Sequence, residues 1–363
     1  MAAERRRGHG IFSGGVRWSD LHPATVVAVV FLLAYPSFSS DFFTVQIGAY
    51  SLILGTIALS LMMLAGYGGI VSLAQLTVAG FTAYLVAILG DNSVGVMGLG
   101  WPWWLTVPVS ILGGAVLGAL IGAIAVRTEG IYTIMITLAI AVVLFFFVRQ
   151  NYVIFNGWTG FAGIEPPTLL GVYWRDPVPF YYLSLLVAGF FFCAVVYLSR
   201  STFGLGLQAI RDNPRRMRAL GFDVALHRIF AFFLAGLVSA TAGVLLVWFY
   251  GRVSPGTMGV EGTIDILVIA VVGGLRHPIG PFLGAIGFVL LENFAIDLID
   301  RERFNTVIGL VFLAIVLFSP DGVLGLWNRI RPRLRFDRNV RPASGRAETD
   351  AGDHPAGVRE STS

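Results

Sequence analysis

Very few side chains in this sequence combine a reactive type with a suggestive position. Glu292 is the clearest, because it lies in the middle of an apolar run next to Asn293, whereas Asp265 and Asp297 lie nearer the ends of such runs. An ionisable group inside a membrane is costly, so its presence calls for a role. The commoner role is to order a helix bundle through an interhelical hydrogen bond or ion pair. The functional alternative is to line the polar path of a solute.

Catalytic and metal-binding patterns are absent from the sequence. The five histidines are scattered without ligand spacing, and no H-E-x-x-H or G-x-S-x-G pattern occurs. Cys193 stands alone in an apolar run, so no disulfide framework or cysteine-based metal site can form. The apolar runs also lack the paired aspartates or Ser/His dyad of an intramembrane protease. We therefore expect no enzymatic activity, no metal and no cofactor.

The basic residues restrict the chemistry further, because all 25 are arginine and none is lysine. A phosphate-binding P-loop requires a lysine after its second glycine, and Schiff-base chemistry also requires one. If ATP drives this protein, a separate subunit must therefore bind and hydrolyse the nucleotide.

The composition predicts the elements that position these residues. Hydrophobic residues make up 56% of the 363 positions and charged residues only 13%, about half of the charged share in soluble domains. We predict an all-α fold, a polytopic membrane helix bundle of about ten transmembrane helices. The predicted spans are 24–40, 46–66, 70–89, 102–126, 131–148, 179–198, 229–250, 263–275, 280–299 and 304–319. The span 263–275 is short and could be tilted, broken or re-entrant.

The arginines predict the orientation of the bundle. With both termini cytoplasmic, the short arginine-rich connections fall on the cytoplasmic side, as the positive-inside rule requires. The chain then divides into a cytoplasmic N-terminal segment (1–23), a permease domain (24–328) and a disordered cytoplasmic tail (329–363). The arginines of the tail are suited to binding anionic lipid more than nucleic acid.

Glycines at helical spacing indicate close packing between helices. Gly114, Gly118 and Gly122 share one face of their span, as do Gly280 and Gly284. Paired glycines at 68–69 and 273–274 predict breaks at helix ends, a feature found near the substrate path of transporters.

The connection 199–228 is the most informative polar segment. Asn213 can cap a helix that begins at Pro214, and Gly221 can end it, which predicts a short helix over 214–220. Met217 and Leu220 are expected on one side of it, with Arg215, Arg216 and Arg218 elsewhere. A helix this short needs packing to be stable. The paired cap and stop signals favour a protein partner, and a basic loop resting on lipid headgroups is the alternative.

At this connection the sequence resembles the permease subunits of ATP-binding-cassette importers for branched-chain amino acids, in particular the longer of their two paired permeases. The resemblance covers roughly residues 45–327. Its motifs, in family order, are GYGGIVSLAQLTVAGFTAY (66–84), EGIYTIMITLAIAVVLFFFV (129–148), FGLGLQAIRDNPRRMRALGFDV (203–224), SPGTMGVEGTIDILVIAVVGGL (254–275) and SPDGVLGL (319–326). Arg276 and His277 depart from the family pattern, where a glycine and a small residue are usual. Related permeases carry urea, amides or other small solutes, so the substrate stays open.

The resemblance implies a function and partners. The chain would move branched-chain amino acids or a related small polar solute across a prokaryotic inner membrane. It would work with two cytoplasmic ATPases, a second homologous permease and an extracytoplasmic solute-binding protein. The loop would dock on an ATPase as a coupling helix through Ala209, Ile210, Arg211, Asp212, Asn213, Pro214, Arg215, Met217, Leu220 and Gly221.

Polar residues on apolar spans are the candidates for the substrate path. Besides Glu292 they are Ser72, Gln75, Thr77, Thr133 and Thr137. Hydroxyl groups in membrane helices more often bond their own backbone or a neighbouring helix. A self-contained carrier or facilitative channel for a small polar solute is the alternative function.

Overall fold

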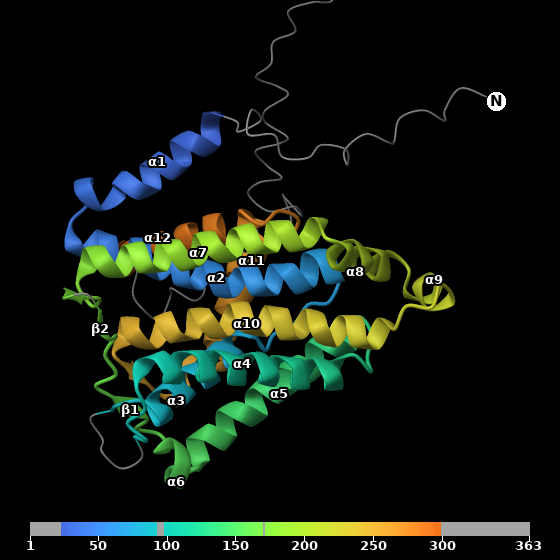
Figure 1. The fold of residues 1–363 in the computed structure, drawn as a ribbon, viewed down its shortest axis with the longest axis horizontal. Helices are drawn as coiled ribbons and strands as arrows, with labels where there is room; N and C mark the ends of the chain where they lie inside the picture. Colours follow the sequence, from blue (N-terminus) through green and yellow to red (C-terminus); the bar gives the residue numbers. More distant parts are fainter. Residues whose placement is uncertain (1–22, 93–97, 170, 299–363) are drawn as a thin grey trace, which may run out of the picture. The chain divides into compact units, whose positions relative to one another are not determined.

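The computed structural model describes residues 23–92, 98–169 and 171–298. Helices account for most of them, in an order that starts with α1 (Pro23–Phe38) and continues through a central helical segment made of η2 (Phe43–Ala49), α2 (Tyr50–Met62) and η3 (Met63–Tyr67). The remaining helices are α3 (Gln75–Leu89), α4 (Trp103–Ala125), α5 (Ile131–Gln150), α6 (Tyr152–Phe155), α7 (Pro177–Arg200), α8 (Thr202–Asp212), α9 (Pro214–Ala219), α10 (Val224–Tyr250), η4 (Pro255–Met258), α11 (Val260–Gly273) and α12 (Gly280–Leu298). Their arrangement is drawn in Figure 1.

The predicted spans coincide with helices wherever the structure describes them. Two spans differ from the prediction by five residues at their start. The helix α3 begins only at Gln75 instead of 70, because the chain after Gly69 runs irregularly to Ala74, and α10 begins at Val224 instead of 229. Among the described residues, five helical segments are long and apolar enough to cross a membrane: Phe43–Tyr67, Trp103–Ala125, Ile131–Gln150, Pro177–Arg200 and Val224–Tyr250. Two shorter apolar helices, Gln75–Leu89 and Gly280–Phe294, accompany them. The predicted span 304–319 and both termini lie outside the described residues.

The centre of the bundle is the continuous helix Phe43–Tyr67. Almost all of its side chains are buried, including Ile53, Ile57 and Leu61. It packs against α10, α11, α12 and α7. Because every face of this helix is apolar, burial on all sides is the arrangement its sequence favours.

The predicted glycine faces do bring helices together. Gly118 of α4 lies against Gly236 of α10, where an added Cβ would stand 3.0 Å from the Gly236 Cα, and Gly122 lies against Phe232. Gly284 of α12 likewise packs against the backbone of α11 at Ile269 and Gly273. Backbones this close gain van der Waals contact over a long interface, which is the main packing force between membrane helices.

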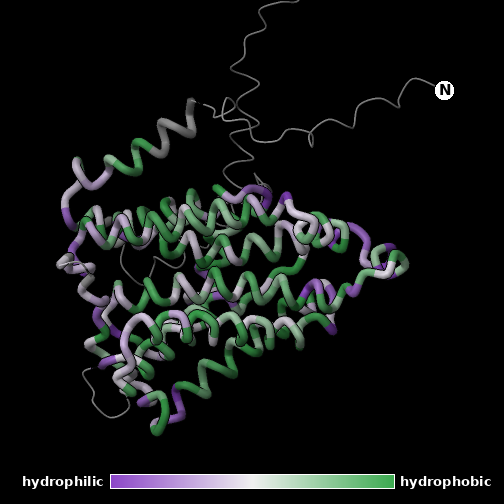
Figure 2. Tube along the Cα trace, viewed as in Figure 1, coloured by the Kyte–Doolittle hydropathy of each residue, from purple (hydrophilic) through white to green (hydrophobic). Residues whose placement is uncertain are grey.

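The helices α5 and α7 expose many of their apolar side chains, whereas the central helix buries almost all of its own. On α5 and α7 large apolar side chains such as Met135, Val143, Leu186 and Phe190 are exposed. In Figure 2 the helical shafts are largely hydrophobic, and hydrophilic residues gather toward helix ends and connections. Exposed apolar shafts with polar ends are the pattern expected of helices that face lipid.

The connections fall at the two ends of the bundle as alternate membrane crossings require. At one end β1 (Phe161–Ala162) pairs with β4 (Arg252–Val253), which joins the segment after α5 to the segment after α10. A second hairpin there, β2 (Thr168–Leu169) with β3 (Val172–Tyr173), is fastened by the 2.7 Å ion pair of Arg175 and Glu165. The hydrogen bond to Glu165 raises the pKa of the Tyr173 hydroxyl. The α8–α9 segment (Thr202–Ala219) lies at the other end.

Candidate coupling surface and intramembrane pocket

The α8–α9 segment is built from consecutive capping signals. The Ser201 hydroxyl accepts a hydrogen bond from Gly204 N at 3.2 Å and so begins α8. The Asn213 side chain accepts one from Arg216 N at 3.0 Å and so begins α9. Gly221 ends α9 with φ +89°, a conformation that side chains rarely adopt. The predicted short helix is therefore confirmed, although it ends at Ala219, one residue earlier than expected.

This segment has a small core of its own. Ile210 of α8, Met217 of α9 and Val224 of α10 are buried together, with Ala209 packed against them. Met217 is only 7% exposed, whereas Leu220 is 68% exposed. Leu220 N still donates to the carbonyl of Arg216 at 3.1 Å, as in a helix, so helical spacing alone does not bury both side chains.

The outer face of the segment is basic and uncovered by the described residues. Arg215, Arg216 and Arg218 are exposed, and so is Leu220 beside them. Asp212 is also exposed, with 70% of its side chain accessible. A rigid element that displays three guanidinium groups and an apolar side chain has the composition of a protein interface, in which arginine is enriched.

Arg211 differs from the other arginines of this segment. Its Nη1 donates to the backbone carbonyl of Gly66, at the C-terminal end of the central helix, and its Nε donates to Asp212 at 3.1 Å. The α8–α9 segment therefore contacts the bundle through a polar side chain as well as through Leu207, which is 1% exposed.

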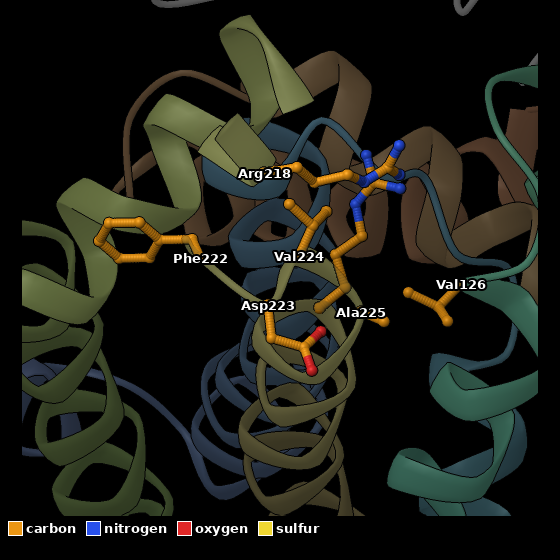
Figure 3. A pocket seen from close by; sticks show the side chains of 7 residues that line it. Val126, Arg218, Phe222, Asp223, Val224 and Ala225 are labelled. Carbon is orange, nitrogen blue, oxygen red and sulfur yellow. The ribbon is translucent and has the colours of Figure 1, made fainter. Parts of the chain in front are cut away.

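A second set of charges joins the segment to the turn between α4 and α5. Glu129 lies 3.9 Å from Arg218 and 4.0 Å from Arg228 of α10. Arg218 also lines a cavity of about 170 Å³ next to Asp223 and Phe222. Figure 3 shows the Phe222 ring directed away from the guanidinium group of Arg218. Asp223, which the sequence analysis did not single out, caps α10 by accepting from Leu226 N at 3.0 Å.

Three of the predicted path residues gather at the irregular stretch before α3. Ser72 is fully buried, Thr137 accepts a hydrogen bond from Leu73 N at 3.1 Å, and Gln75 accepts one from Ser60 at 3.1 Å. The Gln75 backbone carbonyl also accepts from Ser239 of α10 at 2.6 Å. These hydrogen bonds hold the start of α3 in place, so the Thr137 hydroxyl and the Gln75 side-chain oxygen have partners within the chain.

The two other hydroxyl candidates differ from each other. Thr133 donates to the Thr128 carbonyl at 3.1 Å and so shapes the turn between α4 and α5. Thr77 is fully buried, and its hydroxyl has no hydrogen-bond partner among the described residues. An unsatisfied hydroxyl inside a bundle is uncommon, which makes Thr77 the stronger candidate of the two for contact with a solute.

Glu292 lies in an intramembrane pocket, which we define as the cavity of about 140 Å³ enclosed by α2, α3, α10, η4, α11 and α12. Asp265 lines the same cavity, and the Tyr250 hydroxyl donates to the Tyr50 hydroxyl at 3.0 Å at its edge. The pocket thus combines two carboxyl groups, two phenol groups and apolar walls. Such a cavity can hold a small polar solute, especially one that carries a cationic group.

Sequence reasoning missed most of this pocket. Tyr50 lies in the first part of the central helix and Tyr250 is the last residue of α10, and Asp265 was placed near the end of a run without a partner. The signal that could have found them is topological: the start of one span and the end of a span of opposite direction meet at the same membrane level. In the part of the chain that the structure describes, no group of three His, Cys, Asp or Glu side chains could hold a metal ion.

Comparisons with known proteins agree with this architecture. The chain matches the family described as branched-chain amino acid transport system / permease component over residues 43–316. It is 25% identical over 334 residues to the high-affinity branched-chain amino acid transport system permease protein LivM of Escherichia coli, a match that covers 86% of this chain and 76% of that protein.

Other relatives carry different names. The chain is 28% identical over 253 residues to the probable branched-chain amino acid transport permease protein LivH of Methanocaldococcus jannaschii, covering 64% of this chain and 78% of that protein. It is 23% identical over 313 residues to the ribose import permease protein RbsC of Haemophilus influenzae, covering 82% and 92% respectively. No solved structure matches the chain. Since the family match spans most of its length, this multi-pass membrane protein belongs to the branched-chain amino acid transport system permease family.

Proposed function

We propose that this chain is the permease subunit of an ATP-binding-cassette importer that takes up branched-chain amino acids or a related small polar solute. ATP hydrolysis occurs in two partner ATPases at the cytoplasmic side, and a solute-binding protein delivers the solute at the opposite side. A second homologous permease completes the path. The family membership supports the importer class, and the chain's own surfaces support the division of labour.

The observation that carries the proposal is the construction of the α8–α9 segment. Its fixed caps and its small core of Ile210, Met217 and Val224 make it rigid, while Arg215, Arg216 and Leu220 remain outside. A rigid basic surface binds a partner without a large loss of conformational entropy. A loop that only rested on lipid headgroups would need neither the caps nor the core.

The absence of lysine from the sequence supports the same division. Without a P-loop lysine the chain has no phosphate-binding loop of its own, so energy from ATP must reach it through contact with another subunit. The residues that we assign to this coupling, either by touching the partner subunit or by holding the α8–α9 segment in shape and in place, are Ala209, Ile210, Arg211, Asp212, Asn213, Pro214, Arg215, Met217, Leu220 and Gly221. Ile210 and Met217 act from inside the segment, by holding its shape.

The solute path that we assign passes the intramembrane pocket. Glu292 and Asp265 would attract the ammonium group of an amino acid, and the apolar walls formed by Leu54, Leu246 and Ile269 would accept an aliphatic side chain. Thr77 belongs to the same path by its buried hydroxyl. The remaining candidates, Ser72, Gln75, Thr133 and Thr137, would shape the path by holding the break before α3.

Co-purification of the cognate ATPases with the tagged permease tests the proposal. The wild-type chain should retain them, and Arg215→Glu combined with Arg216→Glu should lose them, because reversing two charges at an interface opposes docking. The matched control is Arg276→Glu. Arg276 lies outside this segment, in the turn between α11 and α12, and the variant should retain the ATPases.

ATP dependence separates the proposal from its alternative. Proteoliposomes that contain the assembled complex should take up solute only when ATP is supplied on the ATPase side. Uptake by the permease alone, without ATPases, would instead identify a self-contained carrier or channel and overturn the proposal.

A further inference from the structure

We propose that Arg211 is a positioning residue that transmits movement of the α8–α9 segment to the central helix, and that it does not bind the ATPase. This inference rests on the proposed function. It divides the arginines of one short segment into two groups: Arg215 and Arg216 are exposed for docking, and Arg211, although 41% of its side chain is accessible, bonds to the chain's own central helix.

The first support is the hydrogen bond from Arg211 to Gly66. Gly66 lies in η3, the π-helical turn at the end of the central helix, where backbone carbonyls begin to lack partners within the helix. Arg211 Nη1 donates to the carbonyl oxygen of Gly66. The Nε and Nη2 atoms both lie 3.1 Å from Asp212 Oδ1, so the carboxylate of Asp212 orients the guanidinium group.

The second support is the close fit of the Arg211 side chain on the turn that follows. Gly69 has φ +67°, and a Cβ at that position would stand 2.5 Å from Arg211 Cγ. Gly68, beside it, lies 3.6 Å from Leu207 of α8 by the same measure. The break in the central helix is therefore covered by α8, with an apolar contact from Leu207 and a polar one from Arg211.

The third support is what the break connects. On one side, the central helix lines the intramembrane pocket through Tyr50 and Leu54. On the other side, the irregular stretch leads into α3, which is held by Gln75 and lines the same pocket through Leu76. A displacement of Gly66–Gly69 therefore moves two walls of the pocket together. Glycine-rich breaks of this kind absorb backbone rotation at little cost, which suits a hinge.

The test uses the complete transporter, reconstituted with its ATPases and its solute-binding protein. Arg211→Met keeps the aliphatic stem and removes the donors. This variant should retain the ATPases and hydrolyse ATP, while the solute imported per ATP falls about tenfold, a coupling loss of ordinary size. Arg211→Lys restores one cationic donor and should recover part of the ratio. A role in folding alone would not change the ratio of import to hydrolysis.

Gly69→Ala gives an independent test from the other partner of the contact. The added Cβ displaces the Arg211 stem and also strains the backbone of the break at φ +67°, so this variant should lower imported solute per ATP as well. Combined with Arg211→Met it should lower the ratio little further, because the two changes break one contact. If Arg211→Met fails to fold, Gly69→Ala and Arg211→Lys decide the question in the same assay.

Two results would overturn the inference. One is loss of ATPase binding by Arg211→Met to the same degree as by the double variant Arg215→Glu with Arg216→Glu, which would make Arg211 a docking residue. The other is an unchanged import-to-hydrolysis ratio in both Arg211→Met and Gly69→Ala. Failure of the proposed function has a different signature: the wild-type chain retains no ATPases, and the double variant behaves like the wild type.

Discussion

The α8–α9 segment and the intramembrane pocket are both polar features of an apolar chain, and they are built in opposite ways. The segment comes from consecutive residues, Ser201 to Gly221, whose caps and stop define its shape. The pocket is assembled from side chains far apart in sequence, such as Tyr50, Tyr250 and Glu292. The outer face of the segment is basic, whereas the pocket holds two carboxyl groups.

Because of this difference, we expect the two regions to respond differently to amino-acid substitutions. The segment must keep its shape and its charge, but each is carried by different residues: the shape by Met217 and Asn213, the charge by Arg215 and Arg216. In the pocket, the residues that give it chemistry also sit between packed helices. Substitutions in the segment should therefore separate the effect of its shape from the effect of its charge on ATPase binding. Substitutions in the pocket that keep the size of the side chain should change transport without changing ATPase binding.

The largest effect is expected from Met217→Asp. A carboxylate placed in the small core with Ile210 and Val224 would cost about 3 kcal/mol, more than so small a core can lose. The segment should become sensitive to limited proteolysis and the ATPases should no longer co-purify. Leu220→Asp, at a 68% exposed position, is the matched control for proteolysis and should leave the segment resistant. Equal resistance of both variants would contradict the existence of this core.

Glu292→Gln should come next in size. Removing the negative charge weakens attraction to an ammonium group, and a charged hydrogen bond of about 1.5 kcal/mol corresponds to a roughly tenfold rise in the solute concentration needed for half-maximal uptake. ATPase co-purification should be unchanged. Solute titration of uptake in proteoliposomes measures the effect, with Asn293→Gln as a control on the same helix. A loss of ATPase binding instead would mean that Glu292 orders the bundle.

A smaller effect is expected from Asn213→Ala. Its side chain caps α9 through Arg216 N, and loss of a cap of this kind costs about 1 kcal/mol. The ATPases should still bind, with an affinity about fivefold lower, because part of the binding energy is used to order α9. Asn213→Ser, which keeps a capping oxygen, should restore most of the affinity. Equal weakening by both variants would show that Asn213 contacts the partner directly.

The smallest effect is expected from Tyr250→Phe. It removes the donor of the 3.0 Å bond to Tyr50 and leaves the ring stacking around Phe249 in place. A neutral hydrogen bond contributes about 1 kcal/mol, so half-maximal uptake should shift by no more than about fivefold. The solute titration used for Glu292→Gln measures it. A shift larger than that of Glu292→Gln would place the hydroxyl pair, and not the carboxyl group, at the centre of solute binding.

The sequence predicted the features whose causes are local. Helical spans followed from apolar length, α9 from Asn213, Pro214 and Gly221, and close helix packing from the glycine face of α4. It could not predict that Met217 would be buried and Leu220 exposed, because that depends on how α9 packs against α8 and α10. Nor could it bring Asp265 and Glu292 into one cavity, since their distance depends on how α11 and α12 pack.

The most direct test of the account is whether a partner ATPase covers position 220. The chain has a single cysteine, so a variant with Cys193→Ala and Leu220→Cys carries one reactive thiol on the outer face of the α8–α9 segment. The account predicts that a membrane-impermeant maleimide labels this thiol in the isolated permease and not in the assembled complex. Tyr173→Cys in the same Cys193→Ala background, at the opposite end of the bundle, should be labelled equally in the isolated permease and in the complex with the ATPases alone. Equal labelling of position 220 in the isolated and the assembled permease would contradict the central claim that the α8–α9 segment binds the ATPase.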